Sequence, residues 1–170
     1  MEFIKVAGYA ALGIAALSAA TFALPRHISV ERSAVLNASA EDVLALAASN
    51  EGYQAFNPYR SMDPKLKIEM FGPENGIGSG FRFNGKDGKG TQTVANITGD
   101  TVTYAIDMGF LGKPTQAIRA VPVAEGTEVT WRVDSDMGFN PIFRVFGLFM
   151  DGMMGRTFEL GLENLREAAA

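Results

Sequence analysis

The sequence predicts an α+β fold: a curved antiparallel sheet of six to seven strands around a long C-terminal helix, with two short helices after the first strand. Two patterns indicate this class. Segments rich in β-branched and aromatic residues follow one another between residues 66 and 134, separated by short glycine-containing turns. From Asn140 to about Ala168, apolar residues recur at helical spacing. Short connections require antiparallel strands, and a helix with one apolar face needs a sheet to cover it.

The composition is that of one globular domain and excludes several kinds of site. The chain has 170 residues, of which 47% are hydrophobic, and a net charge of −4. It has no cysteine and only one histidine, His27, so disulfides, thiolate nucleophiles and a zinc site are not expected. Lysine and arginine form no cluster, which argues against nucleic-acid binding. We therefore expect no metal, no cofactor and no nucleic-acid partner, and the oligomeric state stays open.

Residues 1–25 are expected to form a hydrophobic anchor or signal segment before a domain over residues 26–170. No charge occurs from Val6 to Leu24, and at about 1.5 Å per helical residue this run approaches the roughly 30 Å hydrocarbon core of a bilayer. The length favours an uncleaved single-pass anchor. The alternatives are a signal peptide, cleaved near the small residues Ser18, Ala20 and Ala23, or a buried core helix.

The charges around this run indicate the side of the membrane. Lys5 precedes the run and favours a cytoplasmic N-terminus, which would place the domain outside the cytoplasm. Arg26 and Arg32 lie on the other flank and weaken this bias. The expected location is a membrane with the domain outside the cytoplasm, or the exported state after signal cleavage.

The domain begins with a strand from Ile28 to Leu36. Ser39 has the features of a helix N-cap, with Asp42 three residues later, and this helix should run to about Ser49. A second short helix is expected from Glu51 to Phe56, ended by Asn57 and Pro58, before a polar loop. Six strands are then expected over residues 66–71, 80–84, 90–98, 101–108, 115–124 and 127–134.

Asn140 and Pro141 begin the last helix, as N-cap and first helical residue. A helical projection separates two faces. The apolar face is centred on Phe143, Phe146, Met150, Met154, Thr157 and Gly161. The opposite face contains Arg144, Arg156, Glu159, Glu163 and Arg166.

The apolar face of this helix and the inner face of the sheet define the candidate binding site. Strand alternation places Trp131 inward, where it could meet Phe83 and Tyr104. The predicted ligand-binding residues are Phe83, Tyr104, Trp131, Phe143, Phe146, Met150, Met154 and Thr157. Each has a purely structural alternative: the apolar residues could be core, and the Thr157 hydroxyl could bond back to the carbonyl of Met153. No catalytic residue is predicted, because no local spacing pairs two ionisable groups.

Several motifs in this order resemble the START-like (SRPBCC) superfamily, in its polyketide cyclase/dehydrase branch. They are the helix start Asn37 to Val43, Phe56-Asn57-Pro58, the glycine turn Gly76 to Gly80, Gly126 to Trp131, and Gly155 to Leu165. The resemblance covers roughly Ile28 to Ala168 and implies a helix-grip fold. Members of this branch often have tryptophan in the second helix, where this chain has Tyr53 and Phe56.

The function expected from these features is a membrane-tethered binding module for a hydrophobic small molecule such as a lipid, an isoprenoid or a polyketide. The resemblance also implies an alternative, a cyclase/dehydrase-like enzyme that confines an apolar substrate in a reactive geometry. A scaffold domain with a filled core is the third interpretation.

Overall fold

The computed structural model describes residues 5–7, 9, 13 and 21–170. The predicted anchor from Val6 to Leu24 falls largely outside the described residues. Within the described part of the chain, no helix is both long enough and apolar enough to cross a membrane. The elements of the domain begin at His27 and end at Ala168.

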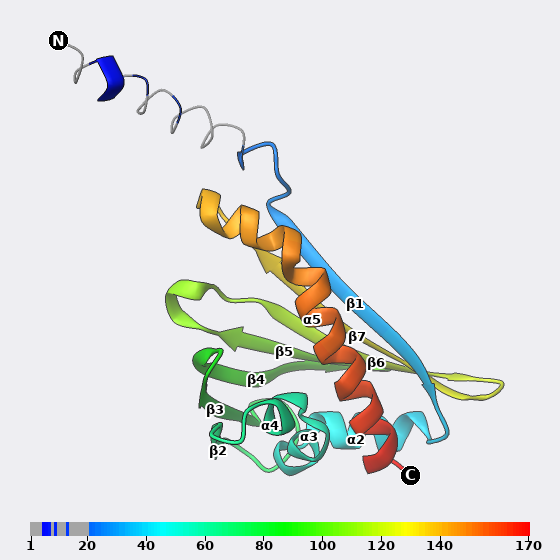
Figure 1. The fold of residues 1–170 in the computed structure, drawn as a ribbon. Coiled ribbons are helices and arrows are strands. Elements are labelled where there is room, and N and C mark those ends of the chain that lie inside the picture. The colour runs from blue at the N-terminus through cyan, green and yellow to red at the C-terminus, as the bar shows by residue number, and fades with distance from the viewer. Residues whose placement is uncertain (1–4, 8, 10–12, 14–20) are drawn as a thin grey trace.

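The fold is the predicted α+β class, with one seven-stranded antiparallel sheet (Figure 1). The strands are ordered β1-β7-β6-β5-β4-β3-β2, so β1 returns to pair with β7 and every other pair is adjacent in the chain. Their bounds are β1 His27–Leu36, β2 Lys67–Phe71, β3 Gly80–Gly85, β4 Gly88–Thr98, β5 Thr101–Asp107, β6 Thr115–Val123 and β7 Gly126–Asp136. The predicted strands are confirmed to within two residues at each end.

Three short helices follow β1: α2 (Ala40–Ala48), α3 (Asn50–Phe56) and α4 (Pro58–Met62). Ser39 caps α2 as predicted, since its Oγ accepts a hydrogen bond of 3.0 Å from the backbone N–H of Asp42. Helix α4 lies where the sequence predicts a polar loop. Asn57-Pro58 ends α3 and also begins α4, because the Asn57 side chain accepts a hydrogen bond from the N–H of Tyr59 and Pro58 fits the first helical position.

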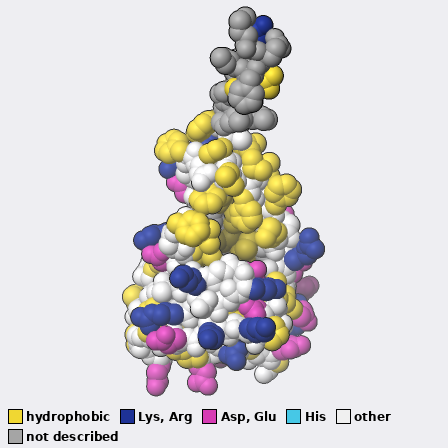
Figure 2. Space-filling view, turned by 60° about the vertical axis from the view of Figure 1, so that its left-hand side comes forward, with side chains coloured by type: hydrophobic (Ala, Val, Ile, Leu, Met, Phe, Trp, Pro, Cys, Tyr) yellow, Lys and Arg dark blue, Asp and Glu magenta, His cyan; other side chains and the backbone are white. Residues whose placement is uncertain are grey.

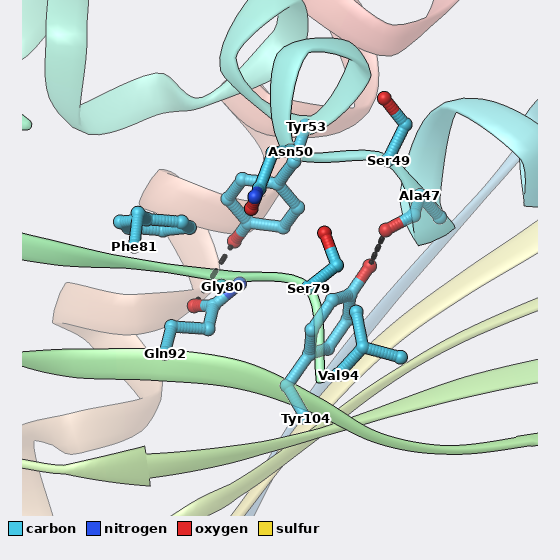
Figure 3. A pocket seen from close by; sticks show the side chains of 10 residues that line it. All are labelled: Ala47, Ser49, Asn50, Tyr53, Ser79, Gly80, Phe81, Gln92, Val94 and Tyr104. Carbon is cyan, nitrogen blue, oxygen red and sulfur yellow. Dashed lines mark hydrogen bonds between the residues drawn. The ribbon is translucent and has the colours of Figure 1, made fainter. Parts of the chain in front are cut away.

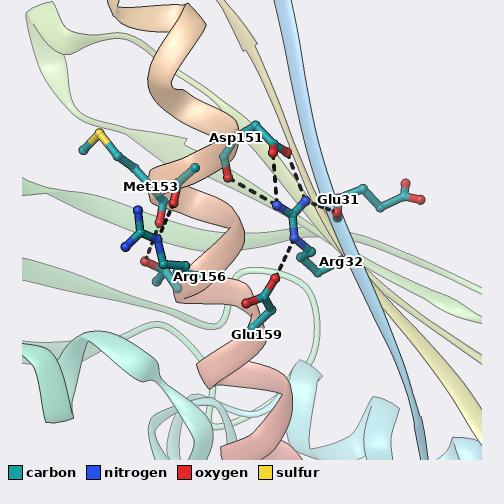
Figure 4. A network of polar contacts seen from close by, with 8 residues as sticks. Glu31, Arg32, Asp151, Met153, Arg156 and Glu159 are labelled. Carbon is teal, nitrogen blue, oxygen red and sulfur yellow. Dashed lines mark hydrogen bonds and ion pairs between the residues drawn. The ribbon is translucent and has the colours of Figure 1, made fainter.

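Helix α5 (Pro141–Ala168) is the predicted long helix, capped by the side chain of Asn140. It crosses the sheet along β1 (Figure 1). Gly147 and Gly155 permit this close approach: a methyl group built on Gly147 would lie 3.0 Å from Cγ1 of Ile28. Arg32 of β1 bonds to the carboxylates of Asp151 and Glu159, each at 3.0 Å, and so ties the strand to the helix (Figure 4).

Trp131 lies in the aromatic core where α5, α3 and the sheet meet. The side chain is fully buried, as predicted, and its ring stacks on Phe158 with centroids 5.2 Å apart. Tyr53 and Phe56 of α3 contact it edge-on, at centroid distances of 6.1 and 5.6 Å. Tyr53 and Phe56 thus complete the aromatic core around Trp131.

The prediction that Arg144 lies on the solvent face of the last helix is wrong. Its side chain is buried, and its guanidinium donates to backbone carbonyls of Phe22, Leu24 and Gly138. The helical projection failed here because α5 rests on the edge strand β1. The packed face therefore includes Arg144, Gly147, Gly155, Phe158 and Leu162 in addition to Met150, Thr157 and Gly161 of the predicted stripe. It extends beyond the stripe on the side of Arg144, and Phe143, Phe146 and Met154 stay partly exposed.

Candidate functional site

The apolar stripe of α5 lies beside its packing face and is partly exposed. The helix packs on β1 and β7 and against α3 and α4. Met150 is almost fully buried, Phe143 and Met154 are half-buried, and Phe146 is 48% exposed. Figure 2 shows hydrophobic side chains gathered over the upper part of the domain, around a hollow.

Buried amide and phenol groups lie on the inner face of the sheet, next to this apolar region. Gln92 of β4 and Gln116 of β6 are 6% and 4% exposed. The Nε2 group of Gln116 donates to the Tyr53 hydroxyl at 3.0 Å, and that hydroxyl donates to Oε1 of Gln92 at 3.4 Å. The Nε2 group of Gln92 has no partner among the described residues. We call Tyr53, Gln92 and Gln116 the polar trio.

A small cavity of about 10 Å³ adjoins the trio (Figure 3). Its lining comes from the α2–α3 junction and strands β3 to β5: Ala47, Ser49, Asn50, Tyr53, Ser79, Gly80, Phe81, Gln92, Val94 and Tyr104. The Tyr104 hydroxyl donates to the carbonyl of Ala47 at 2.6 Å. A volume of this size holds about one water-sized group, so it can accept one polar atom of a ligand but not its apolar body.

The buried tyrosines are hydrogen-bond donors rather than bases. Burial raises the pKa of Tyr53 to about 12, although its bonds to Gln116 and Gln92 act in the opposite direction. Burial also raises the pKa of Tyr104, and that of Tyr59. All three hydroxyls are therefore protonated at neutral pH. These hydroxyls therefore offer hydrogen bonds next to apolar side chains.

Helices α3 and α4 connect the polar trio to the apolar stripe. Tyr53 on α3 lies among Phe56, Phe81 and Tyr104, with ring centroids 4.9 to 5.4 Å apart. Tyr59 on α4 directs its hydroxyl toward the sulfur of Met154 at 3.8 Å.

The eight predicted ligand-binding residues fall into three environments. Trp131 is enclosed by packed rings, and a methyl group on Gly161 of α5 would lie 2.4 Å from its Cζ3 atom. Tyr104 lines the small cavity, while Phe83 is half-buried beside Phe81 at 6.4 Å. The remaining five residues, Phe143, Phe146, Met150, Met154 and Thr157, form the α5 stripe. The Thr157 hydroxyl bonds back to the carbonyl of Met153 at 3.2 Å. Their role in binding stays a prediction.

Sequence reasoning missed the polar trio, although the strands contain a signal for it. Gln92 stands in phase with Val94, and Gln116 in phase with Ile118, so each amide occupies a position of the inward, apolar phase. A polar residue at such a position needs a buried hydrogen-bond partner. That partner is Tyr53, which comes from α3 and could not be assigned without the tertiary structure.

The described residues contain no group of three side chains that could hold a metal ion. A wider hollow of about 450 Å³ lies between α3, α4 and the end of α5, but it is open. Its lining side chains are mostly polar: Gln54, Ala55, Asn57, Arg60, Ser61, Asn164, Glu167 and Ala168.

Comparison with solved structures shows the same fold in proteins of low sequence identity. Truncated norcoclaurine synthase from Thalictrum flavum superposes with a TM-score of 0.64 at 12% identity, over 83% of this chain and 92% of that one. A Nitrosospira multiformis protein gives 0.58 at 15% identity, over 84% and 96%. The di-domain aromatase/cyclase StfQ of the steffimycin pathway gives 0.60 at 12% identity, over 84% of this chain and 51% of that chain.

The chain thus spans about half of StfQ, a di-domain protein. A comparison with curated protein sequences finds no match. A family model described as polyketide cyclase/dehydrase and lipid transport matches residues 27–170, which is the whole domain from the first strand to the C-terminus. The chain therefore belongs to the polyketide cyclase/dehydrase and lipid transport family.

Proposed function

We propose that the domain binds a hydrophobic small molecule along the α5 stripe and holds an oxygen atom of that molecule at the polar trio. The observation that carries this proposal is the Nε2 group of Gln92, which is buried without a partner at the inner end of an apolar surface. An amide N–H in this position donates to a carbonyl, hydroxyl or carboxylate oxygen. The family description, which includes lipid transport, supports the same ligand class.

The energetics favour a ligand that is mostly apolar with one polar end. A buried donor without a partner costs about 1–3 kcal/mol, which a ligand oxygen would recover. The apolar body would add about 25 cal/mol for each Å² that it buries against Phe143, Met150 and Met154. Affinity would therefore come mainly from the stripe, and the orientation of the ligand from the trio.

Native mass spectrometry of the purified full chain tests this proposal, with extraction and identification of any molecule that co-purifies. A fluorescent fatty acid and an anthraquinone serve as probes of the lipid and polyketide classes. We expect one of them to bind with one-to-one stoichiometry. Gln92→Leu should weaken the binding of a probe that contains a polar oxygen. Glu125→Gln, in the exposed β6–β7 turn, is the matched control. Saturable binding that both variants retain equally would place the ligand away from the trio.

We also propose that residues 6–24 tether this domain to a membrane and that the domain lies outside the cytoplasm. The support is the uncharged sequence of that run and the position of Lys5 before it. Fractionation with a high-pH wash tests the tether, and protease protection of the domain in sealed vesicles tests its side. A processed form beginning between Thr21 and Arg26 would instead indicate a signal peptide.

A cyclase-like activity is the second candidate, and the buried protonated hydroxyls of Tyr53 and Tyr104 favour it. Each hydroxyl donates within the protein, to Gln92 and to the carbonyl of Ala47, and would exchange that acceptor for a carbonyl of a folded substrate. Confinement alone accelerates an intramolecular step. The test is mass analysis of a poly-β-ketone analogue after incubation with the protein. Recovery of the analogue with the loss of water, and its absence with Tyr53→Phe, would assign an enzyme rather than a carrier.

A further inference from the structure

The N-terminal third of α5 is exposed and apolar on several sides. Ile142, Val145, Leu148 and Phe149 are 73%, 41%, 55% and 62% exposed, and Phe146 lies beside them. Phe139, just before the helix, is 70% exposed. We call these six residues the apolar end. Packing on β1 does not require them, because Gly147 and Gly155 of α5 face Ile28 and Arg32 of that strand. Figure 2 shows that hydrophobic side chains gather over the upper part of the domain.

The apolar end presents no exposed charge. From Met137 to Met150 the only charged residue is Arg144, and its side chain points inward to three backbone carbonyls. The nearest carboxylates in the chain, Asp136 and Asp151, are both paired with arginines, at 2.6 and 3.0 Å. An anionic lipid surface would therefore meet apolar side chains and neutralised carboxylates.

Arg144 also fixes the place where the uncharged N-terminal run enters the domain. Its Nη1 group donates to the carbonyls of Phe22 at 2.9 Å and Leu24 at 3.2 Å, and its guanidinium lies 5.2 Å from the centre of the Phe22 ring. The backbone N–H of Met137 donates to the carbonyl of Arg26 at 2.8 Å. The last residues of the run are thus bonded directly to the start of α5.

A second exposed aromatic residue lies at the same end of the sheet. The register pairs Thr115, the first residue of β6, with Asp134, two residues before the end of β7. The β5–β6 connection therefore lies at the end of the sheet where α5 begins. This connection contains Phe110, which is 85% exposed, and Leu111, which is 44% exposed.

We propose that the apolar end of α5 and the Phe110–Leu111 turn lie in the interface of a lipid bilayer, with Arg144 holding the domain in that orientation. This inference rests on the proposed tether. Clustered phenylalanine and leucine side chains without charge are typical of interfacial helices, which bury their apolar face at the headgroup boundary. The α5 stripe begins within this end of the helix, at Phe143 and Phe146, so an apolar ligand bound there would pass between bilayer and protein without crossing water.

Site-directed spin labelling of the full chain in vesicles of phosphatidylcholine and phosphatidylglycerol tests the proposal. The protein has no cysteine, so single cysteines can be introduced directly. Phe149→Cys and Phe110→Cys probe the two contacts. Leu160→Cys is the matched control, because it is an exposed apolar position of the same helix, about 16 Å further along at 1.5 Å per residue. Collisions with oxygen report lipid, and collisions with a water-soluble nickel complex report solvent.

We expect the oxygen-to-nickel ratio to be several-fold higher at positions 149 and 110 than at position 160. Equal ratios, in protein that resists a high-pH wash, would overturn the interfacial orientation and leave the tether intact. Lipid contact at 149 and 110 in protein that the wash removes would support the orientation and reject the tether. Absence from the vesicles would overturn both. If the label at position 149 shows spin–spin broadening and is reached by neither oxygen nor the nickel complex, the surface contacts a second copy of the chain instead of lipid.

Discussion

Gly161 of α5 lies against the ring of Trp131, so close that a methyl group at this glycine would be 2.4 Å from the ring atom Cζ3. Glycine in the middle of a helix costs about 1 kcal/mol relative to alanine. The contact with Trp131 explains why the helix contains it there. The glycine serves close packing of helix and sheet rather than space for a ligand.

Gly161→Ala should therefore destabilise the domain, because the overpacking cost of about 1–3 kcal/mol exceeds the gain in helix propensity. Gly152→Ala in the same helix is the matched control, since a methyl group there meets no atom within 4 Å. The control should stabilise by about 0.5–1 kcal/mol. Urea denaturation measures both free energies of unfolding. Equal effects of the two substitutions would contradict the contact.

Trp131 is the only tryptophan and is fully buried, so its fluorescence should be protected from acrylamide and iodide in the native protein. Trp131→Ala should cost about 3–5 kcal/mol, as large aromatic truncations in cores do. Trp131→Phe should cost less, because it keeps a ring against Phe158 and removes an indole N–H that has no partner in the described residues. If acrylamide and iodide quench the Trp131 fluorescence of the native protein freely, Trp131 lies on the solvent face of β7 and not in the core.

Alkaline pH should unfold the protein through its tyrosines. The pKa of Tyr53 is raised to about 12 in the folded state, and those of Tyr59 and Tyr104 are also raised. In the unfolded state these hydroxyls titrate near pH 10. Between about pH 10 and 12 the folded state thus binds more protons, and stability falls as pH rises.

Absorbance of tyrosinate, followed together with circular dichroism, measures this effect. Three of the four tyrosines should ionise only as the fold is lost, in one step with the change in ellipticity. Tyr53→Phe should reduce the slope of stability against pH in this range. Ionisation of all four tyrosines while the ellipticity remains native would show that the hydroxyls are accessible.

Met150→Trp should fill the hollow beside the α5 stripe and abolish retention of an apolar probe, because Met150 is buried at its border. Met153→Trp is the control on the same helix, at a side chain that is 54% exposed, and should leave retention unchanged. Circular dichroism and the unfolding midpoint establish that both variants are folded. A folded Met150→Trp variant that retains the probe fully would remove Met150 from the site, and an unfolded one would assign it to solid core.

Leu148→Glu should slow the transfer of a fluorescent fatty acid from vesicles to the protein several-fold. Leu148 is exposed in the apolar end and away from the stripe, so affinity for probe added in solution should not change. Glutamate opposes insertion of this surface into an anionic bilayer. Leu160→Glu, beyond the apolar end, is the control. If the variant and the wild type take up the fatty acid at the same rate, the ligand does not enter through this surface.

The sequence determined which elements form and in what order, because those signals are local. Ser39 and Asn140 cap their helices through bonds to residues two or three positions away, and glycine turns separate strands whose alternation is visible in the sequence. The sequence does not reveal α4, since Asn57-Pro58 both ends one helix and begins the next. Strand alternation also placed Trp131 in the core.

Only the tertiary structure decided how α5 is rotated about its axis and what lies opposite the apolar stripe. A projection places the strongest apolar face against the sheet, but Gly147 and Gly155 allow closer contact with Ile28 and Arg32 of β1. This packing leaves part of the stripe exposed and buries Arg144, whose charge is accommodated by carbonyls of residues 22, 24 and 138. The polar trio likewise depends on residues from α3, β4 and β6 that meet only after folding. Contacts between segments far apart in the chain leave no periodic signal in the sequence, and for that reason the site became visible only in three dimensions.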